Sequence, residues 1–113
     1  VAIPLHKKRL HERGYNQSYL VARELGKLMQ LPVSNGGLIK IKDSKPQVRT
    51  TSVDERRKNV ENAFTCTTTL FQQKRLILID DVCTTGASLE ACSVALKSAG
   101  ASSVWGLTIA RET

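Results

Sequence analysis

Two adjacent carboxylates and a run of small residues make residues 80–88 the part of this sequence best suited to chemistry. Asp80 and Asp81 come first, and the small residues that follow Cys83 are Thr84, Thr85, Gly86, Ala87 and Ser88. Small side chains leave the backbone amides open to a ligand, and the three hydroxyls can converge with those amides on one anion. Carboxylates beside an anion site suit a ligand that also carries sugar hydroxyls or a metal ion. A phosphorylated ribose satisfies both halves of the stretch.

The residues on either side predict a strand, a tight loop and a helix. Residues 76–79 form an unbroken apolar run, which is typical of a strand buried on both faces. Beyond the loop, Gly100 supplies a stop after apolar residues at helical spacing, namely Leu89, Cys92, Leu96 and Ala99. The helix start would add partial positive charge to an anion site. An ordinary strand-to-helix turn, in which Asp and Thr serve only as caps, is the alternative.

The other segments predict a small α/β domain. We expect strands over residues 1–5, 38–41, 62–66 and 103–110, with Trp105 in the core, and a short helix over residues 52–59. A longer helix is expected from the N-cap Asn16 to about Gln30, with an apolar face of Leu20, Val21, Leu25, Leu28 and Met29. This order predicts a single domain over residues 1–113. Its architecture would be an open, three-layer, mostly parallel sheet flanked by helices, with one antiparallel edge strand.

Positive charge is the main feature of the composition, with a net charge of +7. Many cations fall in residues 6–14, a segment expected to form a loop after the first strand. Such a loop would lie at the carboxyl edge of the sheet, where open α/β folds bind ligands. The charge suits an anionic partner, and it fits a sugar polyphosphate and a nucleic acid equally well.

Several classes of protein are excluded. The single glycine in the loop, with no Gly-Lys-Ser/Thr after it, excludes a P-loop and a dinucleotide-binding fingerprint. No apolar run is long enough for membrane insertion. The three widely spaced cysteines, Cys66, Cys83 and Cys92, support neither a zinc site nor a disulfide framework, and they fit a reducing cytoplasm.

At family level, residues 76–88 resemble the phosphoribosyl pyrophosphate signature of type I phosphoribosyltransferases, with its apolar strand, acidic pair and Thr-Thr-Gly. Residues 13–17 and 55–60, with Ala63 and Phe64, are similar to one branch, the ComF-like competence proteins. The resemblance covers nearly the whole chain and implies the type I phosphoribosyltransferase fold. Relatives in that branch usually begin with a cysteine-rich, zinc-binding segment, which residues 1–113 lack.

The resemblance also implies a reaction, in which a nitrogen nucleophile displaces pyrophosphate from phosphoribosyl pyrophosphate. Asp80 and Asp81 would be the catalytic pair that holds the ribose hydroxyls. The 5-phosphate would bind to the loop formed by Cys83, Thr84, Thr85, Gly86, Ala87 and Ser88. Mg²⁺ would be held through the substrate, bridging pyrophosphate and ribose oxygens. The cations expected to contact pyrophosphate are Lys7, Lys8, Arg9 and Arg13.

Residues 43–51 are polar and aperiodic, which is typical of a lid or of a linker. The resemblance favours a lid that closes over the substrate through Lys45, Gln47 and Arg49. An alternative function is a non-catalytic ligand sensor, or an adaptor in DNA uptake that binds single-stranded DNA or a helicase partner. A homodimer is a further assembly to consider.

Overall fold

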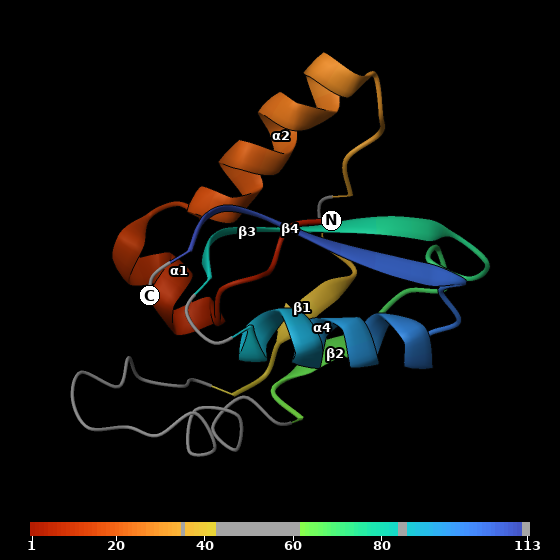
Figure 1. The fold of residues 1–113 in the computed structure, drawn as a ribbon. Helices are drawn as coiled ribbons and strands as arrows, with labels where there is room; N and C mark the ends of the chain where they lie inside the picture. Colours follow the sequence, from red (N-terminus) through yellow and green to blue (C-terminus); the bar gives the residue numbers. More distant parts are fainter. Residues whose placement is uncertain (35, 43–61, 84–85, 112–113) are drawn as a thin grey trace.

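The computed structural model describes residues 1–34, 36–42, 62–83 and 86–111. Within these ranges the helices are α1 (Lys7–Arg13), α2 (Gln17–Met29) and α4 (Ala87–Ser98) (Figure 1). The strands are β1 (Leu38–Lys40), β2 (Phe64–Cys66), β3 (Arg75–Cys83) and β4 (Ser103–Arg111). The expected helix over residues 52–59 and the expected lid over residues 43–51, with Lys45, Gln47 and Arg49, lie outside the described residues.

The described strands form two small open sheets. β3 and β4 pair in parallel, with Leu78 opposite Gly106 and Asp80 opposite Thr108. β1 and β2 pair antiparallel, with Leu38 opposite Cys66. The α/β class is therefore confirmed. The expected predominance of parallel pairing stays a prediction, because one of the two described ladders is parallel and the other is antiparallel.

The first residues of the chain lie beside β3, as a strand there would, but they form only an isolated bridge. The backbone N–H of Ile3 donates to the carbonyl of Ile79 over 2.9 Å, and the N–H of Ile79 donates to the carbonyl of Val1 over 2.8 Å. A second parallel bridge joins His6 to Lys40 of β1. Residues 1–6 thus pass from the edge of one sheet to the edge of the other.

Helices α2 and α4 pack against different faces of the β3–β4 pair. Ile77 and Ile79 of β3 line a small apolar pocket with α2. On the other face, the Leu89 side chain of α4 lies 3.5 Å from the position that a Cβ would occupy at Gly106. Figure 1 shows α2 and α4 on opposite sides of these strands. A three-layer phosphoribosyltransferase architecture for the whole protein stays a prediction.

The core lies between α4 and the strands. Leu78 of β3 and two α4 residues, Cys92 and Leu96, are its largest fully buried side chains. Phe64 of β2 and Phe71 pack into the same cluster. Cys92 and Leu96 are four residues apart, so they lie on one face of the helix. The expected helix after the loop is therefore confirmed, together with two of its core positions.

Three expectations about local structure were wrong. The cationic segment after the first strand is the helix α1 rather than a loop. The His6 side chain caps α1 by accepting from the N–H of Lys8 over 3.2 Å, and Gly14 ends it in the left-handed region at φ 84°. The apolar face expected for α2 is wrong at its C-terminal end, because Leu28 is 80% exposed. Trp105 is 70% exposed, so it is not a core residue.

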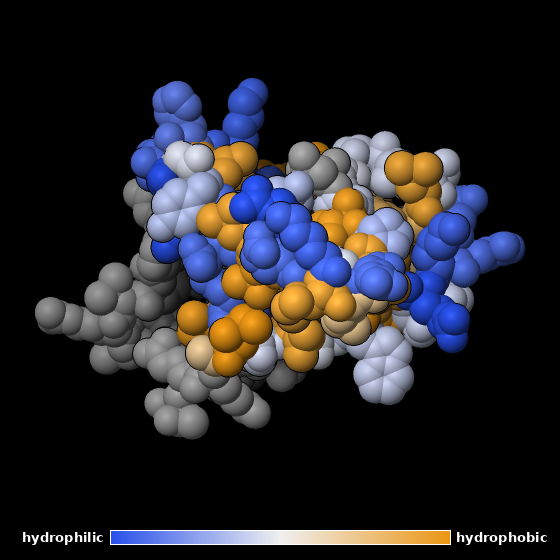
Figure 2. Space-filling model, turned by 90° about the horizontal axis from the view of Figure 1, so that it is seen from above, coloured by the Kyte–Doolittle hydropathy of each residue, from blue (hydrophilic) through white to orange (hydrophobic). Residues whose placement is uncertain are grey.

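One group of exposed hydrophobic side chains lies on α2, on the segment that follows it and on the outer strand β4. They include Leu28, Met29, Leu31, Trp105, Leu107 and Ile109. Figure 2, viewed from the α2 side, shows hydrophobic surface interspersed with hydrophilic side chains. α2 covers β3 on this face and leaves β4 open, which explains why Trp105 is exposed although its strand is correctly predicted. Among the described helices, none combines the length and apolar character needed to span a membrane.

Candidate functional site

The two carboxylates lie inside a strand and not in the loop that follows it. β3 continues past the apolar run of residues 76–79 through Asp80 and Asp81 and ends at Cys83. The strand was expected to end before the acidic pair. Both side chains are half-buried. Their backbone positions are therefore held by the β3–β4 ladder, in which Asp80 pairs with Thr108.

Ser18 of α2 contacts both carboxylates. Its hydroxyl oxygen lies 3.4 Å from Oδ1 of Asp80 and 3.3 Å from Oδ1 of Asp81. The same oxygen accepts a hydrogen bond from the backbone N–H of Asp81 over 3.2 Å. A serine hydroxyl carries one hydrogen, so it donates to one carboxylate at a time. Ser18 is only 4% exposed, and it is the one buried polar residue in the described part of the chain.

The start of α2 explains why Ser18 reaches the acidic pair. The Asn16 side-chain oxygen caps the helix by accepting from the N–H of Ser18 over 3.1 Å. The Asn16 amide also donates to the carbonyl of Ile3 over 3.0 Å. Because Ile3 is bonded to Ile79 in β3, these contacts fix the first turn of α2 beside the strand just before Asp80. The sequence identified Asn16 as a cap and did not identify Ser18, whose role depends on this packing.

The pKa of Asp80 is raised from 3.8 to about 6, and burial is the largest cause. The hydrogen bond with the Asp81 side chain and the negative charge of Asp81 contribute to the same rise, because both favour a proton on Asp80. The Ser18 hydroxyl acts in the opposite direction, since it donates to the charged carboxylate. The site therefore holds a carboxyl group that changes charge close to neutral pH, which is common at functional sites.

The loop between β3 and α4 is short. β3 ends at Cys83 and α4 begins at Ala87. Gly86 is the N-cap, in the left-handed region at φ 77°, and it supplies no side-chain cap bond. Ala87 is buried and Ser88 is half-buried. The backbone of Cys83 completes β3, and Thr84 and Thr85 lie outside the described residues.

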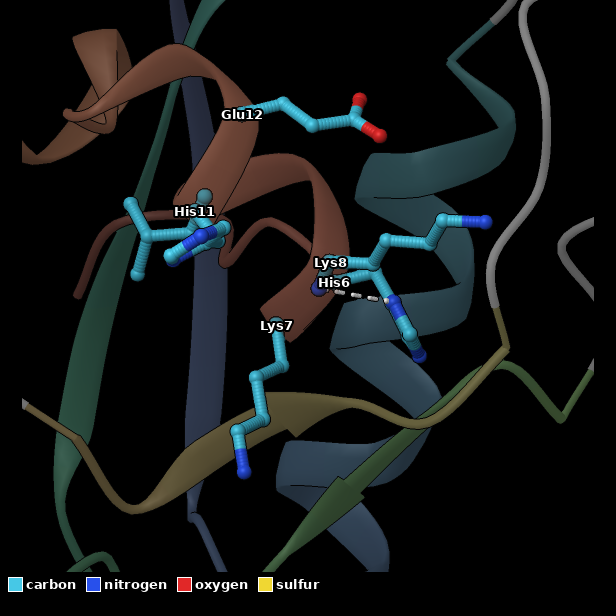
Figure 3. A pocket seen from close by; sticks show the side chains of 6 residues that line it. His6, Lys7, Lys8, His11 and Glu12 are labelled. Atoms are coloured by element: carbon cyan, nitrogen blue, oxygen red, sulfur yellow. Dashed lines mark hydrogen bonds between the residues drawn. The ribbon is translucent and has the colours of Figure 1, made fainter.

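The cations expected to contact pyrophosphate all lie on α1. Lys7 and Lys8 line an open hollow of about 750 Å³ together with His6, Leu10, His11 and Glu12 (Figure 3). In Figure 3 the side chains of Lys8 and Glu12 extend to the same side of α1, and Lys7 extends to another. Arg9 and Arg13 do not line this hollow. The guanidinium of Arg13 lies 5.8 Å from the centre of the Tyr15 ring.

The side chains in the described ranges contain no group of three or more His, Cys, Asp or Glu residues placed to hold a metal ion. Mg²⁺ usually keeps several waters and takes substrate phosphates beside few protein carboxylates. The described residues therefore fit Mg²⁺ only when a phosphorylated substrate supplies most of the oxygen ligands.

Comparison with known proteins supports one part of the resemblance. The chain is 35% identical over 111 residues to Competence protein F of Haemophilus influenzae, covering 95% of this chain and 48% of that protein. It is also 28% identical over 104 residues to DNA utilization protein YhgH of Escherichia coli O157:H7 and of strain K12, covering 92% of this chain and 45% of each.

The chain spans about half the length of the curated relatives it matches. No family model matches it, and no solved structure matches it. The similarity is to one competence protein and to DNA utilization proteins. The phosphoribosyltransferase part of the resemblance stays a prediction.

Proposed function

We propose that this ComF-like protein binds phosphoribosyl pyrophosphate together with Mg²⁺. The observation that carries the proposal is the position of the acidic pair. Asp80 and Asp81 lie near the carboxyl end of β3, and only residues 84–86 separate that strand from the start of α4. One ligand with hydroxyls at one end and a phosphate at the other would meet the carboxylates and the helix start together.

The carboxylates suit the ribose end of such a ligand. Ionised carboxylates accept hydrogen bonds from hydroxyl groups, and these bonds are stronger than neutral ones. Ribose hydroxyls would favour the charged form of Asp80, so binding should lower its pKa and release protons near pH 6. In the reaction, the same negative charges would stabilise the positive charge that develops at the anomeric carbon.

The phosphate groups would meet the backbone and the cations. The 5-phosphate would lie at residues 83–88, where Gly86 leaves the chain without a Cβ and α4 directs its dipole at the ligand. The pyrophosphate would be held by Lys7, Lys8, Arg9 and Arg13. Closure by Lys45, Gln47 and Arg49 would then exclude water.

The proposed chemistry is transfer of the phosphoribosyl group to a nitrogen nucleophile. Mg²⁺, when bound through the substrate, supplies charge neutralisation for the departing pyrophosphate. The protein residues bind and orient the sugar and exclude water, which is the larger part of such catalysis. The three-layer phosphoribosyltransferase fold and a cytoplasmic location belong to this proposal, and the free thiols of Cys66 and Cys92 fit a reducing compartment.

Calorimetric titration tests the proposal. Phosphoribosyl pyrophosphate is titrated with and without Mg²⁺ into the unaltered protein and into an Asp80→Asn/Asp81→Asn variant. Glu24→Gln serves as a matched control, because Glu24 is an exposed carboxylate of α2. Metal-dependent binding that survives in the control and is lost in the double variant supports the site. If the folded unaltered protein binds no ligand, the proposal fails.

A second candidate function is an adaptor that binds single-stranded DNA in DNA uptake, alone, as a homodimer or with a helicase partner. Two observations favour it: the similarity to Competence protein F and the exposed cations of α1 beside Tyr15, a residue that is 48% exposed. Cations and an exposed aromatic ring are the groups that bind single strands. Fluorescence anisotropy with a labelled oligonucleotide should show a steep loss of affinity with salt. Lys7→Glu/Lys8→Glu should reduce that slope.

A further inference from the structure

We infer that Ser18 is a positioning residue of the ribose site, whose hydroxyl holds Asp80 and Asp81 together so that both carboxylates face one sugar. The inference rests on the proposed function, since it assigns Ser18 a role in binding the same ligand. Ser18 lies in α2, and Gln17 is the last residue of that helix that carries the family resemblance. The contacts of Ser18 with Asp80 and Asp81 span 62 and 63 residues of the chain.

The strand alone would not bring the two carboxylates together. Successive side chains of a strand project to opposite faces, so Asp80 and Asp81 should point apart. The structure instead places one oxygen of each within 3.4 Å of the same hydroxyl. The N–H of Asp81 donates to that hydroxyl as well, which leaves the hydroxyl hydrogen available to the carboxylates. Ser18 is therefore the point at which the two acidic side chains converge.

A closed circuit of hydrogen bonds fixes the backbone that carries the hydroxyl. It runs from Ile79 of β3 to Ile3, from Ile3 to Asn16 and from Asn16 to Ser18, with distances of 2.9, 3.0 and 3.1 Å. Ser18 then closes the circuit on Asp80, the residue that follows Ile79. Because the circuit returns to β3, the backbone of Ser18 stays beside the acidic pair, and the N–H of Asp81 then holds the hydroxyl itself.

The convergence has a chemical consequence for the ligand. Two like charges held close together repel each other, and the Ser18 hydrogen offsets part of that repulsion. Without it, the two carboxylates should lose the orientation in which both accept from neighbouring hydroxyls of one ribose. Ser18 would thereby contribute to the preference for ribose over 2-deoxyribose, which lacks one of those hydroxyls. Removing the Ser18 hydroxyl should weaken binding of ribose by about the contribution of one hydrogen bond to a charged group.

The binding test compares two probes, ribose 5-phosphate and 2-deoxyribose 5-phosphate, by calorimetry. Ser18→Ala should weaken binding of ribose 5-phosphate about tenfold or more and leave the deoxy compound within about twofold. Ser102→Ala is the matched control, because the Ser102 hydroxyl makes a comparable bond, to the Lys74 carbonyl over 3.1 Å, elsewhere in the fold. It should leave both affinities unchanged.

The conservative variant separates positioning from packing. Ser18→Thr keeps the hydroxyl and should restore the preference for ribose 5-phosphate. Where that variant does not fold, Ser18→Cys keeps the volume with only a weak donor and should behave like Ser18→Ala. A second readout needs no ligand: carboxyl-carbon NMR titration should show a higher Asp80 pKa in Ser18→Ala, since the lost bond favours the charged form.

The outcomes distinguish the two proposals. If the unaltered protein binds neither sugar phosphate nor phosphoribosyl pyrophosphate, the proposed function fails and the role of Ser18 fails with it. If it binds ribose 5-phosphate and a folded Ser18→Ala keeps the same ratio between the two probes, the proposed function stands and the inference about Ser18 is overturned. The inference is supported if the preference for ribose 5-phosphate over 2-deoxyribose 5-phosphate falls in Ser18→Ala but not in Ser102→Ala, and if the Asp80 pKa rises in Ser18→Ala.

Discussion

Asp80 should reduce the stability of the folded protein at neutral pH, and Asp80→Asn should therefore stabilise it. The physical reason is that burial and the neighbouring Asp81 make the charged form of Asp80 unfavourable in the folded state. Asn has nearly the same shape, carries no charge and can still bond to Ser18. A functional group held at some expense of stability is a common feature of binding sites.

The magnitude follows from the pKa. A rise from 3.8 to about 6 corresponds to an upper limit of about 3 kcal/mol, at roughly 1.4 kcal/mol for each tenfold change in proton affinity. Because the carboxyl group is partly exposed, solvent screening reduces this to about 1 to 2 kcal/mol. The sign follows from proton binding: between the two pKa values the folded state holds more protons than the unfolded state, so stability falls as pH rises through this window.

Urea denaturation measures the effect. The free energy of unfolding is compared for the unaltered protein and Asp80→Asn at about pH 7.5 and about pH 4, where the advantage of the variant should largely disappear. Glu24→Gln, an exposed change on α2, should alter it by less than about 0.5 kcal/mol at either pH. Equal or lower stability of Asp80→Asn at the higher pH would refute the reasoning, as would an advantage that persists undiminished at the lower pH.

Three further predictions concern the loop and the core. Gly86→Val should abolish binding of phosphoribosyl pyrophosphate in calorimetry. It should also lower the free energy of unfolding by about 1 to 2 kcal/mol, because φ at Gly86 is 77°. The control Gly36→Val, at φ 95°, should lower the free energy of unfolding by a similar amount and leave binding of the ligand unchanged. Leu96→Ala should lower the free energy of unfolding by about 2 to 5 kcal/mol in urea denaturation, whereas Trp105→Ala should change it by less than about 1 kcal/mol. Cys92 should resist thiol reagents in the native protein and react after unfolding, because it is fully buried and burial raises its pKa; rapid native labelling, followed by mass spectrometry, would contradict this placement.

Part of the fold could be predicted from the sequence because the signals are local. The apolar run of residues 76–79 lies in β3, and the spacing of Cys92 and Leu96 places both on the buried face of α4. Asn16 caps α2 because its side-chain oxygen accepts from the N–H of Ser18, two residues later in the chain. An N-cap residue always lies this close to the first turn of its helix, so the cap can be predicted from the sequence. The sequence also predicts that an acidic pair near the end of a strand is followed, after Gly86, by the start of a helix, because these residues are close neighbours in the chain.

Other features were decided by tertiary structure. α1 forms in a segment without apolar periodicity, between a histidine cap and a glycine in the left-handed region. Trp105 is exposed because α2 covers β3 and leaves the outer strand open, which the pattern within β4 does not determine. The candidate site depends most on such distant packing. The sequence by itself determined that Asp80 and Asp81 are adjacent, but their convergence on Ser18 and the raised pKa of Asp80 arise from burial and from contacts 62 and 63 residues apart, which no local pattern specifies.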